Sequence, residues 1–136
     1  MRKDRPVAVG FPEGARLIRA ALERPDYQDA YAMELRPGMP RDPAAWTGIL
    51  RDAFPVVARE GGEVLMEVSA GGLDAWASIV VDVDAECVVL CSSVQTNAWR
   101  SRLYWGAVKR VHPFMARLMM VRTHRRLALA ARNGVT

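Results

Sequence analysis

The sequence predicts an α+β fold in which an antiparallel sheet packs against a long C-terminal helix. Three apolar runs, at 63–69, 73–83 and 87–96, are separated by short glycine-rich or acidic turns, a pattern typical of consecutive antiparallel strands. Residues 103–131 instead repeat apolar side chains every three or four positions, which indicates an amphipathic helix. The 136 residues have the size of a single domain.

The N-terminal half contributes shorter elements, each placed by local signals. Period-two spacing puts Tyr27, Tyr31 and Met33 on one side of a strand. Asp42 is a good helix N-cap, and Pro43 suits the first helical position. In order, we expect a loose arm at 1–12, a helix at 13–22, a strand at 27–35 and a helix at 43–54.

The closing helix contains a proline and an internal arginine that divide it. Pro113 cannot donate its N–H and costs about 3 kcal/mol in a helix interior, so we expect a kink or break at His112. Arg122 falls within the apolar stripe, so the packed part is expected to end near Val121, leaving a basic extension at 122–136. Ala116 and Met120 fall roughly opposite the stripe. Its members are Tyr104, Ala107, Val108, Val111, Phe114, Met115, Leu118 and Val121.

Composition limits the class of protein. The chain is 51% hydrophobic and 25% charged, as in globular rather than disordered proteins. It has no apolar run near the roughly 20 residues of a transmembrane helix, and its basic start lacks the apolar core of a secretory signal. We therefore expect a cytoplasmic protein without a membrane span.

Charge is distributed unevenly along the chain. Residues 1–86 hold ten Lys or Arg and fifteen Asp or Glu, whereas residues 87–136 hold nine Lys or Arg and no acid. Such a split indicates either an anionic partner for the basic part or neutralisation by the acidic part. We favour neutralisation, because both parts belong to one small domain.

The spacing of the cysteines and histidines along the chain favours neither a disulfide nor a metal site. Cys87 and Cys91, four positions apart in a strand, would be separated by about 13 Å, beyond the reach of a disulfide. We expect two free thiols on one face of the sheet. His112 and His124 are twelve positions apart, over three helical turns, so we expect no metal site.

The last third of the chain resembles a bacterial family of unknown function. The resemblance rests on the strand end Val94-Gln95-Thr96-Asn97, the helix start Arg102-Leu103-Tyr104-Trp105 and the kink Val111-His112-Pro113-Phe114-Met115. Upstream, Tyr27-Gln28-Asp29-Ala30-Tyr31 resembles the family's first strand. Met115 stands where the family usually has a histidine, so a role resting on that imidazole does not carry over.

This family looks like part of the START-like, or SRPBCC, helix-grip superfamily of polyketide cyclases, dehydrases and lipid-transport proteins. The resemblance implies a sheet of about four or more strands curled around the C-terminal helix, with an apolar ligand held between them and no cofactor. We predict that a small apolar or aromatic molecule binds there, although plain core packing explains the same side chains. The predicted lining residues are Trp76, Tyr104, Val108, Phe114 and Met115.

Two other functions stay open. The same cavity would serve a cofactor-independent cyclase or dehydratase, with acid–base groups drawn from His112, Tyr31, Tyr104 and Glu67. Alternatively the chain is a structural module, a homodimer whose basic tail docks on a partner. Nucleic-acid binding through that tail is the weaker form of this alternative, because its basic residues are spread around the helix rather than gathered in one stripe.

Overall fold

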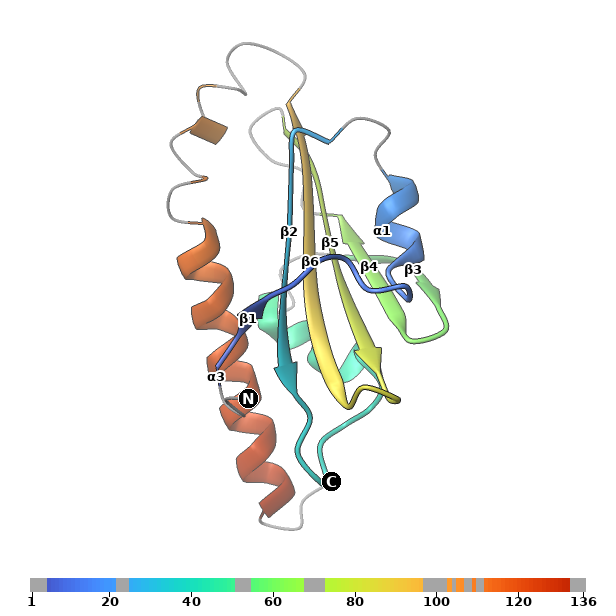
Figure 1. Ribbon diagram of the computed structural model, residues 1–136, viewed down its shortest axis with the longest axis vertical. Coiled ribbons are helices and arrows are strands. Elements are labelled where there is room, and N and C mark those ends of the chain that lie inside the picture. Colours follow the sequence, from blue (N-terminus) through green and yellow to red (C-terminus); the bar gives the residue numbers. More distant parts are fainter. Residues whose placement is uncertain are drawn as a thin grey trace.

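A computed structural model describes residues 5–21, 25–50, 55–67, 73–96, 103, 105–106, 109 and 112–132. They form an α+β fold with a six-stranded antiparallel sheet of order β1-β2-β6-β5-β4-β3 (Figure 1). The strands are β1 (Val7–Ala8), β2 (Tyr27–Glu34), β3 (Val56–Glu60), β4 (Glu63–Glu67), β5 (Leu73–Asp82) and β6 (Cys87–Thr96). The helices are α1 (Arg16–Ala21), the 3-10 helix η1 (Pro43–Leu50) and α3 (His112–Arg132).

The centre of the sheet is the predicted meander. β4 pairs with β5 and β5 with β6, both antiparallel, and the bounds of β6 match the prediction. β2 lies on the other side of β6, in register from Tyr27 opposite Val94 to Glu34 opposite Cys87. The chain therefore brings its first long strand beside its last one.

Both edges of the sheet carry strands that the sequence did not reveal. β1 pairs with β2, so part of the expected loose arm is an edge strand. β3 pairs with β4 across a turn at Gly61 and Gly62. Gly61 has φ of +56°, and a Cβ on Gly62 would lie 2.7 Å from the carbonyl oxygen of Val81. This hairpin needs both glycines, because one has a left-handed backbone and the other touches a neighbouring strand.

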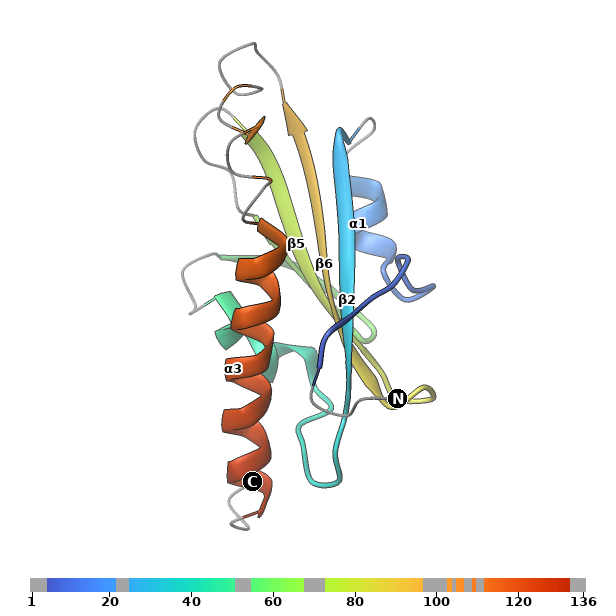
Figure 2. The same ribbon diagram turned by 60° about the vertical axis from the view of Figure 1, so that its left-hand side comes forward.

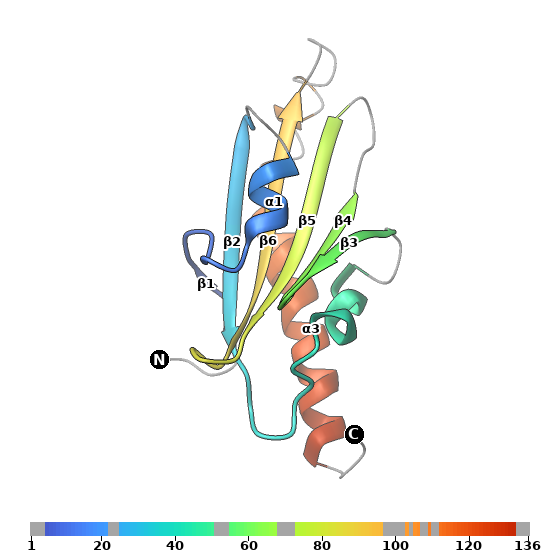
Figure 3. The same cartoon turned by 90° about the vertical axis from the view of Figure 1, so that its right-hand side faces the viewer.

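Helices cover both faces of the sheet (Figures 2 and 3). On β5, Ala77, Ile79 and Val81 pack on the side of η1 and α3, while Val80 and Trp76 pack on the side of α1. Alternating side chains of this strand therefore point to opposite faces of the sheet. The face that carries Trp76 and Val80 is partly covered by α1.

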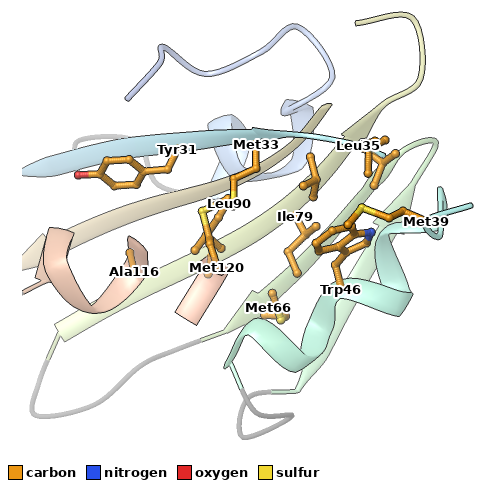
Figure 4. Packing of buried hydrophobic residues seen from close by; sticks show 13 residues of the cluster. Tyr31, Met33, Leu35, Met39, Trp46, Met66, Ile79, Leu90, Ala116 and Met120 are labelled. Atoms are coloured by element: carbon orange, nitrogen blue, oxygen red, sulfur yellow. The ribbon is translucent and has the colours of Figure 1, made fainter. Parts of the chain in front are cut away.

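The larger core lies between the sheet, η1 and the middle of α3 (Figure 4). Trp46 of η1 is 1% exposed, and its indole Nε1 donates to the carbonyl oxygen of Pro40 at 3.0 Å. Asp42 accepts the backbone N–H of Ala44 at 3.0 Å, so the predicted N-cap is confirmed. The predicted α-helix at 43–54 is instead a 3-10 helix over Pro43–Leu50, and 51–54 lie outside the described residues.

The expected break at Pro113 is confirmed. Lys109 lies in a turn, and α3 begins at His112, so Pro113 sits in the first helical turn, where a missing N–H costs nothing.

The predicted orientation of the helix is wrong. Phe114, Met115 and Leu118 are 66%, 45% and 39% exposed, whereas the buried positions are Ala116, Met120, Thr123 and His124.

The packed part of α3 also extends past Val121. His124 is 2% exposed, and its Nε2 donates to the carbonyl oxygen of Glu34 at 2.8 Å. Leu127 and Ala128 pack against the larger core as well. Residues 122–132 therefore continue the core helix rather than forming a separate basic extension, and 133–136 lie outside the described residues. Among the described helices, none is long and apolar enough to cross a membrane.

Candidate functional site

The upper end of the sheet in Figure 1 is formed by the start of β2, the start of β5 and the end of β6. Ile79 and Leu90 are paired neighbours near the middle of β5 and β6, whereas Ala77 pairs with Ser92 farther up. Figure 4 shows Tyr31 at this end of the core and Trp46 at the other. At this end Trp105 packs on Ala75 and Val94 of the sheet.

Two aromatic rings meet at this end of the sheet. Tyr27 of β2 and Trp105 meet edge to face, with ring centroids 5.1 Å apart and ring planes at 61°. Trp105 is 7% exposed and packs with Ala75 and Val94 of the sheet. A cleft of about 240 Å³ opens beside this pair, lined by Asp26, Tyr27, Thr96, Trp105, Gly106 and Lys109.

Hydrogen bonds fix the polar groups near the cleft. The carboxylate of Asp26 accepts from the backbone N–H and the hydroxyl of Thr96 at 2.7 and 2.8 Å, which ties the start of β2 to the end of β6. The hydroxyl of Tyr27 donates to Asp29 at 2.6 Å. Burial, with this carboxylate as a further cause, raises the pKa of Tyr27 above its usual value. Tyr27 therefore stays protonated at neutral pH.

Two cations lie near aromatic side chains on this side of the sheet, one at Tyr31 and one at the cleft. The guanidinium carbon of Arg117, on α3, is 4.9 Å from the ring centroid of Tyr31, within cation–π range. Lys109 is exposed and lines the cleft. The arrangement can stack a small ring against aromatic walls and attract an anionic substituent.

The sheet separates the residues predicted to share a site. Tyr31 faces α3, is 5% exposed and belongs to the larger core. Trp76 packs in the α1-side cluster. Glu67 lies directly opposite Trp76 on the neighbouring strand, so it faces the same side. Neither Trp76 nor Glu67 can line a cavity between the sheet and α3, because the sheet itself stands between them and that helix.

The other predicted residues lie on or before α3. Phe114 and Met115 are exposed on its outer side, so they do not face the sheet. His112 begins the helix, but its side chain lies outside the described residues, as do Tyr104 and Val108.

The structure adds Tyr27, Trp105, Lys109 and Arg117 to the site. Period two along β2 already puts Tyr27 on the face of Tyr31, a signal that could have identified it. No comparable signal marks Trp105 or Arg117, because their positions depend on how the chain turns before α3.

Metal and thiol chemistry find no support in the part of the chain that is described. No group of three His, Cys, Asp or Glu side chains there could hold a metal ion. Cys87 and Cys91 are free thiols on the α1 side, as the spacing predicted. Burial raises the pKa of both, to about 12 for Cys91, so neither is an activated nucleophile.

No protein-family model, curated protein or solved structure matches the chain. The resemblance to the START-like superfamily therefore stays a prediction.

Proposed function

We propose that the protein binds a small aromatic or apolar molecule in the cleft beside Tyr27 and Trp105, in the manner of a helix-grip domain. The observation that carries the proposal is this cleft of about 240 Å³. One wall is an edge-to-face aromatic pair, and the cation of Lys109 stands at the cleft. Ligand sites combine apolar or aromatic walls with a few placed polar groups. This cleft combines two aromatic side chains with the polar side chains of Asp26, Thr96 and Lys109.

The size of the cleft limits the ligand. Pockets for drug-sized molecules hold about 300–1,000 Å³, so the 240 Å³ available here suits a molecule of one ring. Lys109 favours an anionic substituent on that ring. A long lipid chain does not fit, because the core below Tyr31 is filled by side chains such as Met33, Leu90 and Met120.

Binding is a better proposal than catalysis. General acid–base catalysis requires proton donors and acceptors that converge on one substrate. Of the predicted catalytic residues, Tyr31 and Glu67 lie on opposite faces of the sheet, and the side chains of His112 and Tyr104 are not described. The cyclase or dehydratase alternative therefore has no group of described residues to carry it.

The test uses two single-ring probes, benzoate and neutral benzyl alcohol, with binding followed by ligand-observed NMR. We expect both to bind and benzoate to bind more tightly. Trp105→Leu should abolish binding of both, and Lys109→Gln should remove the preference for benzoate. Trp76→Leu is the matched control, because it removes the same ring from the opposite face of the sheet.

Failure of both probes to bind the folded protein would refute the proposal. So would equal loss of binding in Trp76→Leu and Trp105→Leu, because that result would mean general destabilisation rather than loss of a site. Thermal unfolding of each variant shows whether it remains folded.

A further inference from the structure

The outer side of α3 carries a continuous stripe of apolar and cationic side chains. Its members follow one another at three- and four-residue spacing, which places them on one side of a helix. Met115, Leu118 and Leu129 are 45%, 39% and 49% exposed, and Phe114 beside them is 66% exposed. Arg122 and Arg125 are exposed between them. We define the outer stripe as Phe114, Met115, Leu118, Arg122, Arg125 and Leu129.

The charge of this helix is not neutralised within the described part of the chain. α3 contains five arginines and no acidic residue. The described ion pairs join Arg16 to Glu60, Arg41 to Glu86 and Arg59 to Asp42, all within residues 1–86. Direct ion pairs therefore do not neutralise the arginines of α3 within the described part of the chain, and neutralisation of the basic part as a whole stays a prediction. For α3 itself, this observation favours an anionic partner, the other explanation of the charge asymmetry.

We propose that the outer stripe docks α3 flat on an anionic lipid surface. Interfacial helices combine exposed apolar side chains, which enter the boundary between headgroups and acyl chains, with arginines that attract anionic lipids. Phe114, Met115 and Leu118 provide the apolar part at one end of the stripe. Arg122 and Arg125 follow one turn later, close enough to pair with phosphates at the same depth.

Other occupants fit the stripe less well. Nucleic acid needs the arginines but not three neighbouring exposed apolar side chains, because phosphate contacts dominate its binding. A second copy of the chain, placed stripe to stripe, would bring Arg122 and Arg125 against arginines of like charge. A lipid surface uses both the apolar and the cationic side chains. Docking leaves the helix parallel to the membrane, consistent with its being too polar to cross one.

The experiment measures co-sedimentation of the full chain with vesicles of phosphatidylcholine alone or mixed with phosphatidylserine. We expect binding only to the mixed vesicles, weakening as salt shortens the Debye length from about 10 Å at 0.1 M toward about 3 Å at 1 M. Replacing Arg122 and Arg125 by Gln should weaken binding about 30-fold, because each arginine near an anionic surface contributes about fivefold. Phe114→Ser with Leu118→Ser should weaken binding even at low salt.

Two matched double variants control for charge and apolarity elsewhere. Arg16→Gln with Arg59→Gln removes the same charge from the acidic part of the chain, and Val56→Ser with Val57→Ser removes two exposed apolar side chains from β3. Both should bind the vesicles like the unmodified protein. Circular dichroism confirms that each variant is folded.

Three results would overturn the proposal. The first is no binding of the folded protein to mixed vesicles at low salt. The second is equal weakening by the control variants. The third is that the stripe variants lose binding to duplex DNA, or lose dimerisation in light scattering, while vesicle binding is unchanged.

Discussion

The carboxylate of Glu63 on β4 is fully buried and accepts the backbone N–H groups of Leu17 and Ile18 at 2.7 and 3.2 Å. It satisfies donors in the first turn of α1 and so attaches that short helix to the sheet. Glu63→Ala should lower the free energy of unfolding by about 3 kcal/mol, because one buried and one partly buried backbone donor lose a carboxylate acceptor. Urea unfolding measures the change. The control is Glu60→Ala at an exposed ion pair, expected to change stability by about 0.5 kcal/mol or less; similar losses in both variants would contradict this role.

Cys91 makes stability depend on pH in the alkaline range. Burial is the main cause that raises the pKa of its thiol to about 12, whereas the thiol of an unfolded chain ionises near 9. Above pH 9 the unfolded state loses this proton before the folded state does, so stability should fall as pH rises from about 9 to about 12.

The comparison of Cys91→Ala with the unmodified protein in urea at several pH values isolates this effect, which should be smaller in the variant. A thiol reagent at neutral pH should modify Cys91 only after unfolding. Rapid modification of both cysteines in the folded protein would contradict the burial of Cys91.

At the scale of elements, the two sides of α3 should respond differently to truncation. Met120 is 1% exposed within the larger core, and Leu118 is 39% exposed on the outer stripe. Met120→Ala should cost about 2–5 kcal/mol through lost burial and a cavity, whereas Leu118→Ala should cost about 0.5 kcal/mol or less. Urea unfolding of the two variants compares them directly. The reverse order would support the helix orientation predicted from the sequence.

At the scale of the whole molecule, the unneutralised charge of α3 should carry a small cost in stability. Arg122 and Arg126 lie four positions apart on the same helix, where like charges repel. Arg122→Glu replaces this repulsion with an attractive pair, so the free energy of unfolding should rise by about 0.5 kcal/mol at low salt. Vesicle binding by the same variant should weaken.

Urea unfolding at low and high salt provides the control, because screening should reduce the gain. A loss of stability in Arg122→Glu would mean that an acidic neighbour already pairs with Arg122. A variant that is both more stable and less able to bind lipid would link the charge to docking rather than to folding.

Elements whose signals are local can be predicted from the amino-acid sequence. The apolar runs predicted the strands of the meander. Asp42 predicted a helix cap, and Pro113 predicted the break before α3. The spacing of Cys87 and Cys91 also correctly predicted that both are free thiols. These features depend on backbone geometry within a few residues, so they can be predicted without knowledge of the fold.

Which faces of these elements meet depends on contacts between residues far apart in the sequence. β1 and β3 are short edge strands whose existence depends on a partner. The side of α3 that carries Ala116 and Met120 packs into the larger core, so the predicted stripe points outward. The position of Trp76 and Glu67 behind the sheet follows from pairing between distant strands. The candidate site therefore consists of Tyr27, Trp105 and Lys109 rather than the predicted residues. The fold brings these three residues together, but no local sequence pattern links them.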